Sequence, residues 1–172
     1  MKERISTITI ALSLLALAGP TALEAQARVQ TPLIPLEHFF DNPEIGGAQI
    51  SPDGKWLSYV KPYKGKLNVY IRPVNGTERD ERVMTTDTVR PVGQYFWSRD
   101  SRYLLYVQDK GGNENFRIYA VDPSQPGVPV ARDLTPFDKV RAAIYAVPHR
   151  TPGRILVGLN RRIPSAFDAY WL

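Results

Sequence analysis

An internal repeat constrains the fold of this chain more than any other feature of its sequence. Residues 49–60 read QISPDGKWLSYV, and residues 96–107 read FWSRDSRYLLYV. The two segments align without a gap at an offset of 47 residues (98 minus 51), which matches Ser98 with Ser51, Asp100 with Asp53, Tyr103 with Trp56, Leu104 with Leu57, Tyr106 with Tyr59 and Val107 with Val60. In each copy a polar turn leads into aromatic and aliphatic residues that suit a pleated, mostly buried surface. Each copy therefore predicts a strand, a tight turn and a second strand.

The similarity continues into a further strand of each copy. Residues 67–72 alternate in character after a turn expected at residues 62–66, and residues 116–121 are their counterpart. Tyr119 matches Tyr70 at an offset of 49 (119 minus 70), and in a weaker third copy Tyr170 matches Tyr119 at an offset of 51 (170 minus 119). Repeats of about 40 to 50 residues built from strands are typical of β-propeller blades.

The repeats predict an all-β fold, a partial β-propeller of four-stranded antiparallel blades. The expected blades cover residues 45–90, 91–138 and 139–172, which is about two and a half blades, and a lead-in segment at residues 28–44 precedes them. A propeller closes with about four to eight blades. We therefore expect the chain to be the N-terminal part of a longer protein, or to be closed by a partner chain.

Residues 1–27 have the pattern of a secretory signal peptide. Lys2 and Arg4 precede a predominantly apolar run at residues 8–18, and Ala25-Gln26-Ala27 supplies the small residues that signal peptidase recognises. The apolar run is shorter than the roughly 20 residues that a membrane-spanning helix needs. We predict cleavage after Ala27, a periplasmic or secreted location, and no membrane association after cleavage; an uncleaved anchor or a buried helix is the alternative.

Composition excludes several classes of function. The sequence contains no cysteine, so disulfides, thiolate metal sites, cysteine nucleophiles and a lipoprotein anchor are all excluded. The net charge of +5 is unchanged when residues 1–27 are removed, and the basic clusters at residues 150–154 and 161–162 have no interleaved aromatic residues. The charge therefore gives no support to a nucleic-acid surface. No motif for a metal or another cofactor is present, and we expect neither.

Two acidic residues in the repeated turns have side chains of the kind that serve as a general base or a metal ligand. Asp53 and Asp100 occupy equivalent turn positions, where a carboxylate bonds local amides. A general base or metal ligand would need a functional partner close by, and the sequence around these turns supplies none. Residues that recur in successive blades are most simply blade-building residues.

Four segments together resemble the start of the prolyl oligopeptidase family of serine peptidases. They are FFDNPE at residues 39–44, SPDGK at 51–55, GQYFWSRDS at 93–101 and YVQDKGGNEN at 106–115. The likeness is strongest to bacterial secreted members related to dipeptidyl aminopeptidases and acylaminoacyl-peptidases, and it covers the whole chain after the predicted signal peptide. The Ser-Pro-Asp-Gly turn alone is common among periplasmic propeller proteins, whereas its combination with the other segments is more specific.

The resemblance implies a division of labour between two domains. In this family a propeller of seven or eight blades covers an α/β-hydrolase domain and admits short peptides to a serine, aspartate and histidine triad. The family's nucleophile lies on a Gly-x-Ser-x-Gly elbow, and this sequence contains no such motif. No catalytic residue can be transferred. The resemblance therefore implies a propeller portion that gates a C-terminal hydrolase domain outside this chain, inactive alone and packed against that domain and further blades.

Glu114 is the one candidate for contact with a substrate. Some related aminopeptidases bind the substrate's free amine with propeller glutamates, through charge-assisted hydrogen bonds. Glu114 lies in a Gly-Gly-Asn-Glu-Asn turn, where a solvated loop residue is the alternative.

A second class of function also fits the repeats. It is a periplasmic propeller without catalytic activity that binds protein partners through its blade faces. The sequence that follows Leu172 would separate the two, because a Gly-x-Ser-x-Gly elbow followed by aspartate and histidine indicates a peptidase, whereas further blades and then a stop indicate a binding protein.

Overall fold

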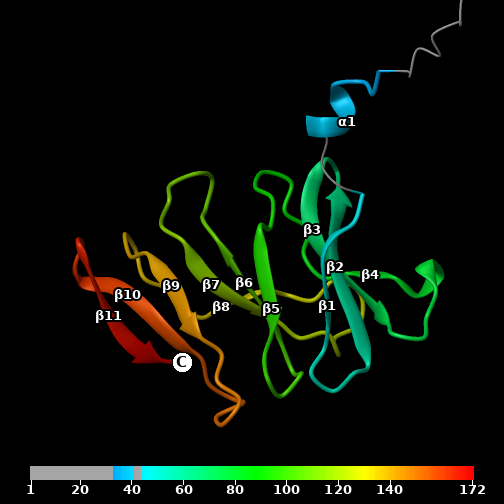
Figure 1. The fold of residues 1–172 in the computed structure, drawn as a ribbon. Helices are drawn as coiled ribbons and strands as arrows, with labels where there is room; N and C mark the ends of the chain where they lie inside the picture. Colours follow the sequence, from blue (N-terminus) through cyan, green and yellow to red (C-terminus); the bar gives the residue numbers. More distant parts are fainter. Residues whose placement is uncertain (1–32, 41–43) are drawn as a thin grey trace, which may run out of the picture. The chain divides into compact units, whose positions relative to one another are not determined.

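Three antiparallel β-sheets make up most of the regular structure (Figure 1). The computed structural model describes residues 33–40 and 44–172, so the predicted signal peptide and part of the lead-in segment lie outside the described residues. The chain divides into two units, Met1–Phe39 and Phe40–Leu172, and all three sheets belong to the second. The prediction of an all-β fold is confirmed.

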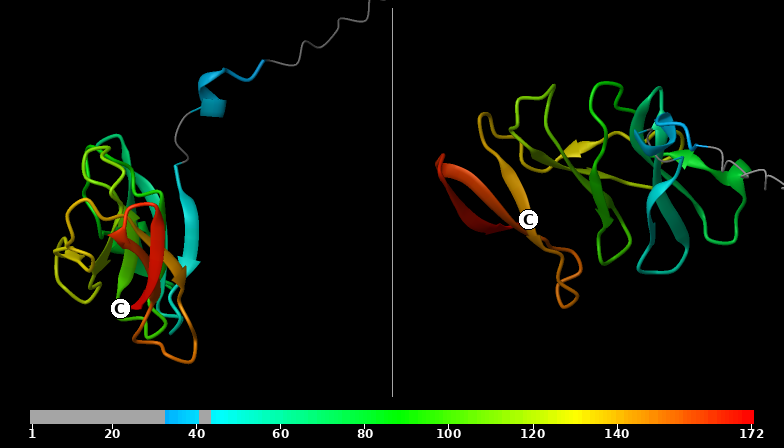
Figure 2. Two further views of the ribbon diagram at one scale, coloured as in Figure 1. Left: turned by 90° about the vertical axis from the view of Figure 1, so that its left-hand side faces the viewer. Right: turned by 45° about the horizontal axis from the view of Figure 1, so that its top comes forward.

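Each sheet is a meander in which every strand pairs with the next one along the chain. The first sheet contains β1 (Gly46–Ile50), β2 (Trp56–Tyr63), β3 (Lys66–Pro73) and β4 (Arg82–Val83). The second contains β5 (Gln94–Trp97), β6 (Leu104–Gln108), β7 (Arg117–Val121) and β8 (Arg132–Asp133), and the third contains β9 (Ala142–Ala146), β10 (Leu156–Ile163) and β11 (Ala166–Trp171). The β1–β2, β5–β6 and β9–β10 turns lie at one end of the sheets, and the β6–β7 loop lies at the other (Figures 1 and 2).

Two short helical segments accompany the strands. The helix α1 covers Glu37–Phe40, and a single 3₁₀ turn, η1, covers Glu78–Asp80 between β3 and β4. Thr77 caps η1, because its hydroxyl accepts from the Arg79 N–H while the Asp80 side chain accepts from the Thr77 N–H. Within the described ranges no helix is long and apolar enough to cross a membrane.

The repeated turns have the same hydrogen bonds in both copies. Ser51 Oγ donates to Asp53 Oδ1 at 2.6 Å and accepts from the Trp56 N–H at 2.9 Å. The same bonds, at the same lengths, join Ser98 to Asp100 and to Tyr103. The hydroxyl of Ser51 holds the pKa of Asp53 below its ordinary value. The two aspartates therefore close the turns that the repeat predicts.

The two turns also contact each other. The second turn places Ser101 in the left-handed region, at φ 59°, where the first turn has a glycine, Gly54. A left-handed residue other than glycine costs roughly 1–2 kcal/mol. Ser101 Oγ accepts a hydrogen bond from the Asp53 N–H at 2.9 Å, so its side chain links the first turn to the second.

Paired tyrosines mark equivalent positions in the first two sheets. Tyr59 lies opposite Tyr70 and Tyr106 lies opposite Tyr119, and the ring centroids of the two stacked pairs are 6.5 and 5.2 Å apart. These are the residues that the sequence offsets match, so the matched tyrosines hold equivalent positions in the two hairpins. In the third sheet Tyr170 holds the equivalent position, but it lies opposite Val157, so no pair of tyrosine rings forms there.

Two apolar clusters join neighbouring sheets. Alternation along β6 sends Leu104 toward the first sheet and Leu105 toward the third. The first cluster includes the fully buried Ile71 and Met84, and the second includes the fully buried Ile118. Full burial of one such side chain contributes about 1.5–3 kcal/mol. The middle sheet is therefore covered on both faces.

A buried polar contact lies inside the first cluster. Ser58 on β2 has no exposed surface, and its Oγ accepts a hydrogen bond from Trp97 Nε1 on β5 at 2.8 Å. The hydroxyl of Tyr95 donates to the Gly47 carbonyl at 2.6 Å, and the Gln49 side chain donates to the Tyr95 carbonyl at 2.9 Å. Strands β1, β2 and β5 are thus joined by directional bonds as well as by apolar packing.

Candidate functional site

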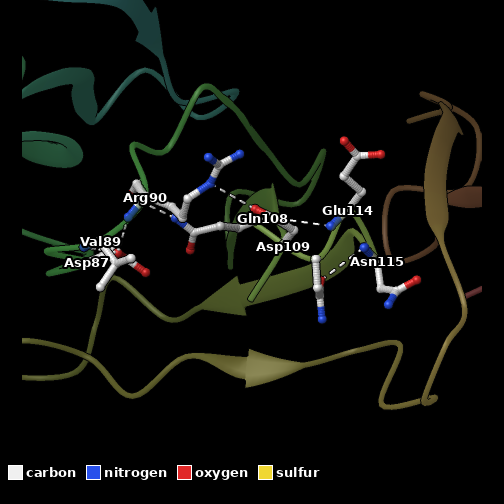
Figure 3. A network of polar contacts seen from close by, with 8 residues as sticks. Asp87, Val89, Arg90, Gln108, Asp109, Glu114 and Asn115 are labelled. Atoms are coloured by element: carbon white, nitrogen blue, oxygen red, sulfur yellow. Dashed lines mark hydrogen bonds and ion pairs between the residues drawn. The ribbon is translucent and has the colours of Figure 1, made fainter. Parts of the chain in front are cut away.

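Glu114 lies in the loop that connects β6 to β7. Its backbone is left-handed, at φ 58°, and two glycines in the same loop, Gly111 and Gly112, are left-handed as well. The loop shares its end of the second sheet with the connection from β4 to β5, because in a meander these two segments leave the sheet on the same side. Figure 3 shows the polar contacts between them.

Asp109 anchors both segments. Its residue is only 5% exposed, Oδ1 accepts from Arg90 Nε at 3.0 Å, and Oδ2 accepts from the Glu114 N–H at 3.0 Å (Figure 3). Burial by itself would raise the pKa of Asp109, but the Glu114 amide and the Arg90 guanidinium together hold this pKa below its ordinary value. A charged carboxylate therefore fixes the backbone on which Glu114 is displayed.

The main chain of Arg90 is fixed by two hydrogen bonds. Its N–H donates to Asp87 Oδ1 at 2.7 Å, and its carbonyl accepts from Gln108 Nε2 at 3.0 Å. The guanidinium thus reaches Asp109 from a fixed main chain. Sequence reasoning missed Arg90 and Asp109, although Asp109 directly follows a strand and precedes the Gly-Gly turn, a position where an aspartate commonly bonds loop amides.

The Glu114 side chain is exposed and extends away from Asp109 and Arg90 (Figure 3). Among the described residues its carboxylate forms no hydrogen bond or ion pair. A carboxylate in this setting can accept charge-assisted hydrogen bonds from an ammonium group. Both predictions for Glu114, contact with a substrate amine and a solvated loop residue, require an exposed side chain, and both stay predictions.

A cavity of about 500 Å³ lies beside this loop, between the second and third sheets. Its lining includes Gln94, Asp109, Phe116, Arg141 and Ile144. The guanidinium of Arg141 lies 5.1 Å from the centre of the Phe116 ring, within cation–π distance. The cavity thus combines an aromatic wall with side-chain donors from Gln94 and Arg141.

The described residues do not form a catalytic constellation. The side chains of His38 and His149 make no hydrogen bond to a serine or an aspartate within the described ranges. In the same part of the chain no three histidine, aspartate or glutamate side chains are grouped as metal ligands. The described side chains of this site offer charge and hydrogen bonds to a ligand.

Comparison with known sequences gives two relatives. No protein-family model matches the chain. It is 43% identical over 163 residues to dipeptidyl aminopeptidase BIII of Pseudoxanthomonas mexicana, covering 94% of this chain and 23% of that protein. It is 28% identical over 143 residues to dipeptidyl peptidase family member 6 of Caenorhabditis elegans, covering 80% of this chain and 19% of that protein. The chain thus spans less than a quarter of the length of either relative.

Solved structures resemble the chain in fold. One of two prolyl endopeptidases studied for interdomain dynamics matches with a TM-score of 0.53 at 17% identity, over 74% of this chain and 19% of that chain. Prolyl oligopeptidase B from Galerina marginata matches at 0.51 and 16%, over 73% and 19%. The β-propeller domain of the Trilobed protease from Pyrococcus furiosus matches at 0.50 and 19%, over 74% and 39%. The propeller class predicted from the repeats is confirmed.

Replacing Asp109 with Asn should destabilise the chain, because the variant removes the charge that pairs with Arg90 and weakens the acceptor for the Glu114 amide. We expect the free energy of unfolding at pH 7 to fall by about 1–3 kcal/mol. The folded-state pKa of Asp109 is lowered from 3.8. Its contribution is therefore fully present above the unfolded-state pKa and is lost as the pH falls through the folded-state pKa.

Urea unfolding at several pH values between 7 and 3 measures this effect. Asp109→Asn should show a shallower loss of stability toward low pH than the parent chain. Asp138→Asn is the matched control, since the Asp138 side chain is 98% exposed and its replacement should change stability by less than about 0.5 kcal/mol. Equal pH dependence of the parent and Asp109→Asn would contradict the anchoring role.

Proposed function

Because this chain is homologous to the propeller region of prolyl oligopeptidase family peptidases, we propose that it is the propeller portion of a serine peptidase that acts on short peptides. In this proposal the propeller gates access to an α/β-hydrolase domain that supplies the catalytic triad. The supporting observation is the 43% identity to a dipeptidyl aminopeptidase over 94% of the chain. The anchored, exposed carboxylate of Glu114 adds a suitable group for a peptide's free amine.

The exposed apolar face of the third sheet supports packing against further blades. Tyr145 is 50% exposed and Trp171 is 54% exposed, and Phe167 shares their face of the sheet. The Tyr145 ring packs directly on Gly158, because an added Cβ atom at this glycine would overlap the ring. Contiguous exposed aromatic surface of this kind is typical of an interface. The partners in this proposal are neighbouring blades and the hydrolase domain.

We also propose a periplasmic or secreted location, on the strength of the predicted signal peptide at residues 1–27. Short peptides are the substrates that a gated peptidase would meet there. No cofactor is required for acyl transfer by a serine triad.

The proposed function is tested by comparing this chain with a protein in which it is joined to its hydrolase domain. The longer protein should release the chromophore from dipeptidyl p-nitroanilides and should lose this activity after treatment with a serine-directed phosphonate. The chain alone should show no turnover. Inhibitor-sensitive turnover by the chain alone would refute the division of labour, and a longer protein that contains only blades would favour the non-catalytic binding propeller.

Replacing Glu114 with Gln in the longer protein tests the amine contact. We expect KM for a substrate with a free amine to rise by about 10-fold or more with little change in kcat, because a hydrogen bond to a charged group contributes about 1.5–3 kcal/mol. KM for the N-acetylated substrate should not change. Glu78→Gln is the control, since Glu78 is an exposed glutamate on η1. Unchanged KM for both substrates would leave Glu114 as a solvated loop residue.

A further inference from the structure

Arg82 connects the outer strand of the first sheet to the second sheet through hydrogen bonds. Arg82 begins β4, and its Nη1 donates to the Pro123 carbonyl at 3.0 Å while its Nη2 donates to the Gln125 carbonyl. The Gly127 carbonyl also lies within 3.5 Å of Nη2. All three carbonyls belong to the loop between β7 and β8. A single guanidinium thus binds the main chain of a turn that the next repeat supplies.

Arg132 is the equivalent of Arg82 in the second sheet. Arg82 begins β4 and lies opposite Ile71, and Arg132 begins β8 and lies opposite Ala120. The next residue along each outer strand lies opposite Tyr70 in the first sheet and Tyr119 in the second, the tyrosines that the repeat matches. The two arginines therefore hold the same position, one repeat apart.

The guanidinium of Arg132 has no carbonyl partner within the described ranges. It lies 5.4 Å from the centre of the Tyr103 ring instead, and the residue is exposed. A guanidinium carries five N–H donors in a planar fork, and stacking on a ring leaves their edges free. The Arg132 guanidinium can therefore donate further hydrogen bonds, whereas the Arg82 guanidinium already donates to main-chain carbonyls.

Arg132 also lines a cavity of about 540 Å³ between the second and third sheets. Apolar side chains form much of its wall, including Leu105, Leu134 and Ile155. The Asp133 carboxylate at its edge is occupied by Arg117, at 2.9 Å. The cavity therefore offers apolar surface, and the Arg132 guanidinium at its wall donates no hydrogen bond to a described residue.

We propose that this cavity docks the tight turn that follows the third strand of the third repeat, and that Arg132 donates hydrogen bonds to the main-chain carbonyls of that turn as Arg82 does. The proposal rests on the proposed function, in which the chain is part of a longer propeller protein. The occupant has the chemistry of residues 122–127. There Asp122 Oδ1 accepts from the Ser124 N–H at 2.9 Å and from Ser124 Oγ at 2.6 Å, which closes the turn and leaves outward carbonyls for an arginine.

An extended chain tests this proposal directly. Because Tyr170 matches Tyr119 at an offset of 51, a second copy of residues 122–138 joined after Leu172 continues the third repeat in register. We expect the extension to raise the melting temperature of the chain. Arg132→Ala should lower the melting temperature of the extended chain by about 2–4 °C, and should change that of the unextended chain by less than about 1 °C.

Two further arginine variants make the comparison specific. Arg102→Ala should have the same effect in both chains, because Arg102 stacks on Tyr103 at 5.6 Å and lines the same cavity without being the equivalent of Arg82. Arg82→Ala should lower the melting temperature of both chains, because its carbonyl partners are present in each. An equal effect of Arg132→Ala in the extended and unextended chains would overturn the proposal.

The natural longer protein provides the second measurement. There Arg132→Ala should cost as many degrees of melting temperature as Arg82→Ala, and an unchanged melting temperature would overturn the proposal even if the engineered extension failed to fold. These readouts concern stability alone. Failure of the proposed function would appear as an absence of peptidase activity, and failure of the docking proposal would appear as thermal equivalence of Arg132→Ala and the parent, so the two remain distinguishable.

Discussion

A buried hydroxyl group fixes how the first repeat sits on the second. Ser58 accepts a hydrogen bond from Trp97 inside an otherwise apolar cluster. Apolar packing is non-directional, so it holds the sheets together without specifying their alignment, and a bond in a dry, low-dielectric setting adds that specification. In the next repeat the position of Ser58 is taken by Leu105. Leu105 belongs to the second cluster, which packs the second sheet against the third through apolar side chains. Contacts between repeats therefore decide the arrangement of the sheets.

The elements that could be predicted from sequence are those that repeat. Matching Ser51 and Asp53 to Ser98 and Asp100 predicted the turns, and the tyrosine offsets matched residues that hold equivalent positions in the two hairpins. The turn expected at residues 62–66 was placed too early, because β2 continues through Pro62. Pro62 lies beyond Val60, the last residue of β2 that pairs with β1, so the missing N–H costs no hydrogen bond to that strand.

The candidate site could be predicted only in part, because its anchor connects segments that the repeat does not relate. Glu114 was identified through the family resemblance, whereas the pairing of Asp109 with Arg90 depends on two loops that meet only in the folded chain. Local sequence shows which loop an aspartate can cap, but the partner from the neighbouring connection is a tertiary feature. The polar residues that recur in the repeats therefore build the blades, whereas Glu114, which does not recur and lies on a loop anchored by Asp109, is the candidate for substrate recognition.

A double-mutant cycle between Ser58 and Trp97 tests most directly the central claim that specific bonds between repeats hold this structure. Urea unfolding of the parent chain, Ser58→Ala, Trp97→Phe and the double variant gives their coupling energy. We predict a coupling of about 1–2 kcal/mol, with a large cost for Ser58→Ala because it leaves the buried indole N–H without an acceptor. Additive effects within about 0.3 kcal/mol would show that the Ser58–Trp97 hydrogen bond does not help to hold the two sheets together and would contradict the account.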